Sequence, residues 1–245
     1  MKFALPIILL LVATQTICAQ VTRIDTAESP NINLPNTSST KNLYLYSIGL
    51  RVYELSQMPK LLKQQNDDFK EWYLSSYFFK FHDNQIRYRI GANYYKDDVK
   101  FNNVCLDCET AAGKLTDFGI KVGFEKVLSY SVVQPYFGFD IGYRKNRFKG
   151  MSQNAGPVVV YTTPYEILAE KNGGVFAPLA GVNFNLINHL TIGVEANLDI
   201  MYNYERREKT MQDAARSQTF ANDRNWEFLA KPVSVFLQYN FELND

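Results

Sequence analysis

The chain is poor in the residue types on which much enzyme chemistry depends. It has only 3 cysteines, 2 histidines and 2 tryptophans among 245 residues. It contains no Walker loop, zinc-protease motif or dinucleotide fingerprint. Lysine and arginine number 26 against 25 aspartates and glutamates, so no positive excess favours nucleic acid. These shortages predict a protein that is not an enzyme, that uses no cofactor or metal, and that binds no nucleic acid.

Long hydrophobic runs are also missing, with one short exception at the N-terminus. Lys2 precedes an apolar stretch over Phe3 to Ala13, and a more polar segment follows as far as Ala19. This order is typical of a secretory signal peptide, which we predict over residues 1–19. Cys18 would permit lipidation instead, although Ile17 stands where lipoprotein signals usually have a small residue. Nothing later approaches 18 apolar residues in a row, so we expect no transmembrane helix in the mature chain.

Residues 20–40 are rich in Ser, Thr, Asn and Pro and show no periodicity. We expect this segment to form a flexible N-terminal tail.

What the remaining sequence has in abundance is period-two alternation. Near the C-terminus, Val233, Val235, Leu237, Tyr239 and Phe241 occupy alternate positions with mostly polar residues between them. Because a strand has period two, the apolar residues share one face. Eight segments show this pattern, at approximately residues 43–52, 72–81, 86–94, 115–127, 137–144, 175–185, 190–200 and 233–241.

The linkers between these segments alternate in length. Those after the second, fourth and sixth segments are short turns, whereas the others run to roughly 17 to 30 residues. This asymmetry is typical of bacterial outer-membrane barrels, whose short turns are periplasmic. We therefore predict an all-β fold over residues 41–242, an eight-stranded antiparallel up-and-down transmembrane β-barrel in the outer membrane of a Gram-negative bacterium, in contact with its lipid.

The polar face of this predicted barrel carries nearly balanced charge. An eight-stranded barrel is only wide enough for side chains to fill it, so enclosed charges must pair or be hydrated. We predict an ion-pair network that braces the lumen; a conducting pore or proton path is the alternative. Its expected members are Arg51, Lys80, Arg87, Arg89, Asp117, Lys121, Glu125, Asp140, Arg144, Glu195 and Asp199.

Two of the long linkers contain features of their own. Cys105 and Cys108 lie three positions apart in an exported chain, which favours a disulfide that tightens the loop; free thiols are the alternative. Val158, Val159, Val160 and Tyr161 are apolar within a polar loop. We expect them either to extend the flanking strands as a hairpin or to pair with a partner through an exposed edge.

The two histidines, His82 and His189, fall in or beside predicted short turns. Small outer-membrane lipid hydrolases and acyltransferases use a histidine with a serine at the outer leaflet. The turns place both histidines at the opposite rim, where we expect ordinary solvated side chains.

The order of signal, tail and eight alternating strands resembles the small outer-membrane β-barrels typified by OmpA and OmpX. The segment Gln134-Pro-Tyr-Phe-Gly-Phe-Asp-Ile-Gly-Tyr143 looks especially like the fifth strand of the PorT-like barrels. The resemblance covers about residues 41 to 242 and implies the fold, with no catalytic residues. Some PorT-like relatives act in protein secretion.

The sequence thus predicts a non-enzymatic outer-membrane barrel with a filled polar lumen. Such a protein would bind a partner, such as another envelope protein, through long external loops or serve as a subunit of an envelope or secretion complex. The alternative is a lipid-modifying enzyme or narrow transporter of the outer membrane.

Overall fold

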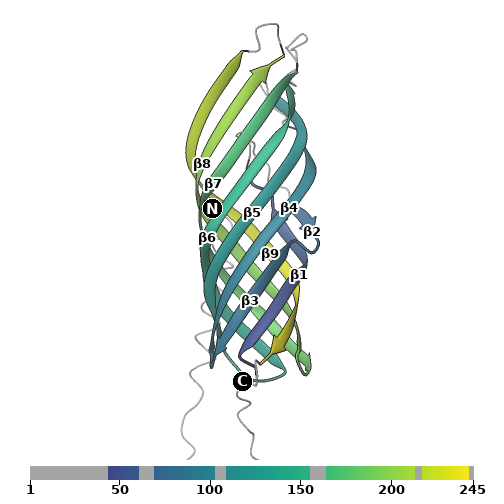
Figure 1. The fold of residues 1–245 in the computed structure, drawn as a ribbon, viewed down its shortest axis with the longest axis vertical. Coiled ribbons are helices and arrows are strands. Elements are labelled where there is room, and N and C mark those ends of the chain that lie inside the picture. The colour runs from purple at the N-terminus through teal and green to yellow at the C-terminus, as the bar shows by residue number, and fades with distance from the viewer. Residues whose placement is uncertain (1–43, 61–68, 103–108, 155–163, 213–216, 243–245) are drawn as a thin grey trace, which may run out of the picture. The chain divides into compact units, whose positions relative to one another are not determined.

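The computed structural model describes residues 44–60, 69–102, 109–154, 164–212 and 217–242. Strands make up most of this part of the chain (Figure 1). They are β1 (Tyr46–Gln57), β2 (Phe69–Trp72), β3 (Ser76–Asp83), β4 (Ile86–Asn102), β5 (Glu109–Val127), β6 (Val133–Asn154), β7 (Tyr165–Ile187), β8 (Leu190–Met211) and β9 (Gln218–Phe241). The predicted signal peptide and tail, residues 1–40, lie outside the described residues.

Eight of the strands form a closed antiparallel ring. Each pairs with its neighbour in the order β1, β3, β4, β5, β6, β7, β8 and β9, and β9 pairs back onto β1. The short β2 pairs with the end of β1 alone, through four residues. The predicted eight-stranded, up-and-down, all-β barrel is therefore confirmed. No helix in the described part of the chain is long and apolar enough to cross a bilayer.

The segment expected to be one strand from Trp72 to Phe81 is broken. β2 ends at Trp72 and β3 begins at Ser76. Leu74 has φ of 53°, in the left-handed region that a non-glycine residue adopts only in a turn or bend. The turn lets β2 lie beside β1 while β3 joins the ring.

The strands are also longer than the sequence predicted. Six of them, β4 to β9, have 17 to 24 residues where about ten were expected. The supposed long loops after β4, β6 and β8 are therefore mostly strand. β6 and β7 stay paired as far as Ser152 and Tyr165, so the flanks of the third linker do continue as a hairpin. The valines at 158–160 and Tyr161 lie outside the described residues.

An apolar band surrounds the part of the ring that includes β1 and β3. Its outward residues are large, solvent-accessible in the isolated chain and uncharged. The row formed by successive register partners shows its continuity: Ile48, Phe79, Ile90, Val122, Ile141, Phe176, Ile200 and Phe228. Aromatic residues mark the edge of the band on the side away from the short turns: Tyr94, Phe118, Tyr143, Tyr202 and Trp226.

Beyond that edge the same outward face becomes polar. The corresponding row of register partners is Lys96, Thr116, Arg147, Glu170, Arg206 and Asn222. Ion pairs cross it between neighbouring strands: Arg147 Nε lies 3.2 Å from Glu170 Oε1, and Lys149 Nζ lies 2.9 Å from Glu166 Oε1. We call the part of β4 to β9 beyond the aromatic edge the extension.

The interior changes in the opposite sense. Within the apolar band it holds charged residues, and within the extension it holds an apolar core. This core includes Leu115, Phe148 and Ile167 from the wall, and Met58 and Trp72 from the chain around the β1–β2 hairpin. The hairpin thus contributes side chains to the core of the extension.

Candidate functional site

The most unusual feature of the interior is its charge. All eleven residues predicted for the lumen point inward from six strands, and each takes part in at least one ion pair. Nine of the eleven are buried, with exposures below 9%, and the side chains of Arg51 and Lys121 are 15% and 13% exposed. Burying a charge without a partner is costly, so this pairing is a condition of the fold.

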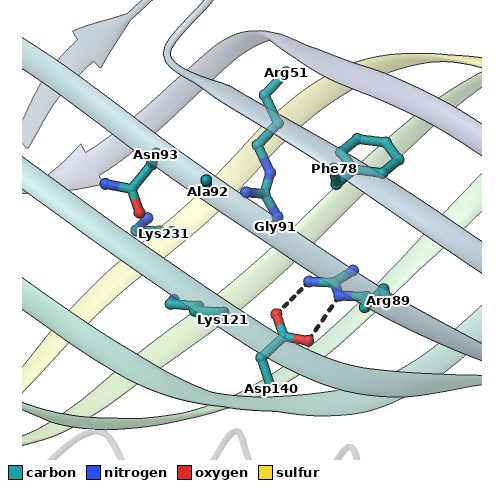
Figure 2. Close-up of a pocket in the computed structure, with 9 residues that line it drawn as sticks. All are labelled: Arg51, Phe78, Arg89, Gly91, Ala92, Asn93, Lys121, Asp140 and Lys231. Atoms are coloured by element: carbon teal, nitrogen blue, oxygen red, sulfur yellow. Dashed lines mark hydrogen bonds and ion pairs between the residues drawn. The ribbon is translucent and has the colours of Figure 1, made fainter.

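Arg89 is the centre of the first cluster. Its Nε and Nη2 donate to the two carboxylate oxygens of Asp140 at 2.7 and 2.5 Å, a bidentate arrangement seen in Figure 2. Its Nη1 donates to Glu195 at 2.5 Å and lies 3.5 Å from Glu125. One guanidinium on β4 therefore ties together β5, β6 and β8 across the lumen.

The carboxylates of this cluster have further partners. Glu125 accepts two hydrogen bonds from Lys80 Nζ, at 2.9 and 2.8 Å, and lies 3.6 Å from Arg87. Glu195 accepts from Arg51 at 2.7 Å and from the Tyr136 hydroxyl at 3.0 Å.

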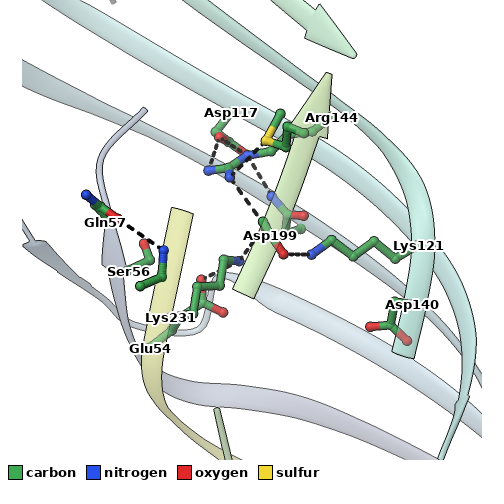
Figure 3. Close-up of polar contacts among 12 residues, drawn as sticks. Glu54, Ser56, Gln57, Asp117, Lys121, Asp140, Arg144, Asp199 and Lys231 are labelled. Atoms are coloured by element: carbon green, nitrogen blue, oxygen red, sulfur yellow. Dashed lines mark hydrogen bonds and ion pairs between the residues drawn. The ribbon is translucent and has the colours of Figure 1, made fainter. Parts of the chain in front are cut away.

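Asp199 is the centre of the second cluster (Figure 3). It pairs with Lys121, and its Oδ2 lies 3.4 Å from Arg144. Arg144 in turn donates through Nε to Asp117 at 2.8 Å. Asp117 also accepts from the Tyr95 hydroxyl at 2.8 Å, which links the charged lumen to the core of the extension.

Two residues that the sequence did not indicate join the clusters. Lys231 Nζ lies 2.9 Å from Glu54 and 3.8 Å from Asp199, while Glu54 lies 3.9 Å from Arg51. Both residues are buried.

Strict alternation would not have placed these two residues inside. On β1 the register shifts between Arg51 and Tyr53, and on β9 it shifts between Lys231 and Ser234. Each shift is a β-bulge, which inserts one residue and moves those beyond it to the other face. Pro232 occupies the second bulge, a position where proline is tolerated in a sheet, and is the one sequence signal that could have indicated it.

Higher in the interior, charge is sparse and paired locally. Lys171 Nζ lies 2.7 Å from Glu227 and donates to the Lys60 carbonyl oxygen at 2.7 Å. Glu227 also accepts from the Lys60 amide, at 2.6 Å. These contacts fix the chain after β1 to the inside of β7 and β9.

The indole of Trp72 lies against β4 in the part of the barrel beyond the end of β3. It stacks on Tyr95 with ring centroids 3.8 Å apart, and its Nε1 donates to Ser56 at 2.9 Å. Outside it, Lys70 pairs with Asp97, and that hydrogen bond lowers the pKa of the Asp97 carboxyl.

The expectation that both histidines are solvated was wrong for His82. His82 is 5% exposed, and its Nε2 lies 2.8 Å from the hydroxyl oxygen of Ser47, which is itself fully buried. It points into the lumen because it follows Phe78 and Lys80 on the inward face of β3. His189 lies in the turn before β8 with φ of 70°, and its Nδ1 is 2.9 Å from the Asn240 carbonyl oxygen.

The predicted disulfide falls in a part of the chain that is not described. Cys105 and Cys108 lie outside the described residues, so the disulfide stays a prediction. Among the residues that the structure describes, no three His, Cys, Asp or Glu side chains are grouped to hold a metal ion.

Comparison with known proteins adds little to this picture. No family model matches the chain, and no curated protein matches it. Among solved structures, it is similar to a major outer membrane protein from Thermus thermophilus, with a TM-score of 0.49 and 10% sequence identity. The alignment covers 80% of this chain and 99% of that one. So distant a likeness supports no functional conclusion, and the resemblance to OmpA, OmpX and PorT-like barrels stays a prediction.

Proposed function

We propose that this chain spans the bacterial outer membrane as a non-conducting, non-enzymatic barrel that presents its extension to another envelope protein. The observation that carries this proposal is the apolar band. A surface of large apolar residues around a whole ring is far greater than the exposed patches of soluble monomers. A bilayer is the environment in which such a surface is favourable.

The height of the band supports the same conclusion. On β4 it runs from Ile86 to Tyr94, and on β8 from Ile192 to Tyr202. Strands rise about 3.3 Å per residue and tilt by roughly 40°, so some ten residues span a band of about 25 Å. The aromatic edge fits the interfacial girdle of such barrels.

The two ends of the barrel support an orientation. The turns that join β3 to β4, β5 to β6 and β7 to β8 are short, whereas the extension lies at the other end. Short turns are periplasmic in bacterial outer-membrane barrels, so the extension would face the outside of the cell. Its charged outer surface suits water there.

The charged lumen favours a barrel closed to passage. Arg89, Arg144 and their partners cross it at its middle, and the core around Phe148 fills the interior of the extension. What remains for function is the extension, which offers three tall hairpins to a partner. A subunit of an envelope or secretion complex would use them in this way.

One observation favours a lipid-modifying enzyme as the second candidate. Ser47 and His82 form a hydrogen-bonded pair, the arrangement that activates a serine nucleophile. Against it, Ser47 is completely buried, and Arg87 lies directly opposite His82 in the register. A cation beside the imidazole disfavours the imidazolium that such catalysis must form.

The membrane proposal is tested by electrophoresis and conductance. Unboiled, refolded protein should stay folded in SDS and migrate differently from boiled protein, because a closed ring has no edge from which to unravel. Reconstituted into planar bilayers, it should give no steady conductance. Identical migration with and without boiling would contradict the membrane barrel, and stable single-channel steps would contradict the closed lumen.

The partner proposal is tested separately in cells. A photo-crosslinking amino acid at Arg147, on the extension, should give a discrete crosslinked protein. The same probe at Lys126, near the short turns, is the matched control and should not give that product. A crosslink from Lys126 alone would place the partner on the periplasmic side and overturn the proposed role of the extension.

A further inference from the structure

A small cavity lies in the middle of the charged lumen. It has a volume of about 20 Å³. Four of its lining residues are cationic and one is anionic: Arg51, Arg89, Lys121 and Lys231, with Asp140. Figure 2 shows these side chains converging from different strands, with the guanidinium of Arg51 directed towards Gly91.

The lumen around the cavity holds more positive than negative charge. Its described cations number seven and its described carboxylates six, once Lys231 and Glu54 join the residues indicated by the sequence. The cations are Arg51, Lys80, Arg87, Arg89, Lys121, Arg144 and Lys231; the carboxylates are Glu54, Asp117, Glu125, Asp140, Glu195 and Asp199.

The carboxylates that pair with the lining cations are mostly shared with other cations or lie outside the wall of the cavity. Asp199 is shared by three cations, Lys121, Arg144 and Lys231. Asp140, the one anion that lines the cavity, is held through both oxygens by Arg89. Glu54 pairs with Lys231, but of the carboxylates that pair with these four cations only Asp140 lines the cavity itself. The wall of the cavity therefore carries more positive than negative charge.

Arg51 supplies an unsatisfied donor. Its Nη2 donates to Glu195, but its Nε is buried and makes no hydrogen bond among the described residues. Glu54 Oε2 lies 3.9 Å from that Nε, beyond hydrogen-bonding distance. A buried, charged donor without an acceptor is costly, so an acceptor in the cavity would stabilise the barrel.

We propose that the cavity binds one monovalent anion of the size of chloride, held by Arg51, Lys121 and Lys231. The excess of one charge matches a monovalent ion. The volume exceeds the 10–15 Å³ or so that a single water needs, and it is too small for phosphate or a carboxylate-bearing metabolite. The bound anion neutralises the lumen in the same way as a seventh carboxylate would.

Thermal unfolding of the refolded full chain in detergent tests the site. At constant ionic strength, replacing gluconate with chloride should raise Tm by several degrees and the effect should saturate, as mass action requires of one site. Bromide should act likewise and give an anomalous diffraction peak in the cavity. A Tm independent of chloride, or a rise that never saturates, would overturn the proposal.

Variants of the lining residues show whether the chloride effect depends on their charge or on the volume of the cavity. Arg51→Gln balances the lumen and should abolish the chloride effect, whereas Arg51→Lys keeps the charge and should retain it. Asp140→Asn raises the excess to two and should enlarge it. If Arg51→Gln does not fold, Gly91→Ala tests the site by narrowing the cavity and should weaken the chloride effect on Tm. The added Cβ would lie 3.5 Å from the Tyr77 carbonyl oxygen, without clash.

The exposed lysine of the extension provides the control for general salt effects. Lys149→Gln removes a charge from the outer surface, where the side chain is 65% exposed. Its Tm should depend on chloride as that of the unmodified protein does. Equal chloride dependence in all variants, Arg51→Gln included, would show that the effect is general screening and would refute the site.

Discussion

The band and the extension of this barrel bury opposite kinds of side chain. On β6, Asp140 points inward below the aromatic edge, Arg144 points inward beside it, and Phe148 points inward above it. On the same strand's outer face, Ile141 lies below the edge, and Lys149 lies above it. The backbone alternation continues without interruption, and only the polarity of the two faces exchanges.

This exchange shows that the polarity of the barrel interior is the opposite of the polarity of the outer surface at the same height. Where the outside is apolar, the inward positions are free to be charged, and the strands are held by ion pairs across the lumen. Where the outside is polar, the inside is a core like that of a soluble protein. The point of exchange on each strand therefore marks the depth at which, on the proposed function, lipid gives way to water.

The largest effect should come from breaking the charged lumen at Arg89. Arg89→Met removes one partner of Glu195 and leaves the buried carboxylate of Asp140 without its ion-pair partner. Loss of one member of a buried pair costs about 3–5 kcal/mol. Equilibrium urea unfolding in detergent would measure this. The control, Arg147→Met in the extension, removes a 55% exposed arginine and should cost less than about 1 kcal/mol.

The next largest effect should come from placing charge on the outside of the band. Ile90→Arg puts a guanidinium in the proposed lipid face and should cost about 2–4 kcal/mol near the midplane. Met151→Arg makes the same kind of change on the outer face of the extension, opposite Glu166, and should be close to neutral. Refolding yield into vesicles and urea unfolding would compare them; equal costs would show that the band does not face lipid.

Period-two alternation was sufficient to predict the barrel and its lumen. The eleven inward charges were identified because strand faces follow from alternation alone, as Arg87 and Arg89 on β4 illustrate. Their pairing was not predictable, since Arg89 and Glu195 lie 106 positions apart in the chain. Such contacts depend on the ring as a whole.

Three features escaped prediction for physical reasons. Glu54 and Lys231 are inward only because bulges shift the alternation on their strands. The strands of the extension were predicted to be loops because their apolar residues point inward and their polar residues outward, the reverse of the pattern in the band. His82 was assigned to solvent because it borders a turn, but the inward face of β3 continues to the end of that strand.

A smaller effect is expected from the core of the extension. Ile167 is completely buried there, so Ile167→Val removes one methylene and leaves a small cavity. The cost should be about 0.5–1.5 kcal/mol. Leu168→Val, at the next position on the outer face, should cost clearly less. If the two variants unfold at the same urea concentration, the interior of the extension is not packed as a core.

The smallest effect should come from the ion pairs on the outer face of the extension. Lys149 and Glu166 lie 2.9 Å apart with side chains 65% and 45% exposed. In a double-mutant cycle with Lys149→Gln and Glu166→Gln, we expect a coupling of about 0.2–1 kcal/mol that falls as salt is added.

The lumen pair of Lys80 and Glu125 has nearly the same separation, 2.8 Å, but is buried. Its single variants should be strongly destabilising, and high salt should change their cost little because buried pairs are poorly screened. Equal salt sensitivity in the two cycles would mean that water reaches the lumen freely, and the contrast between the band and the extension would then lose its electrostatic basis.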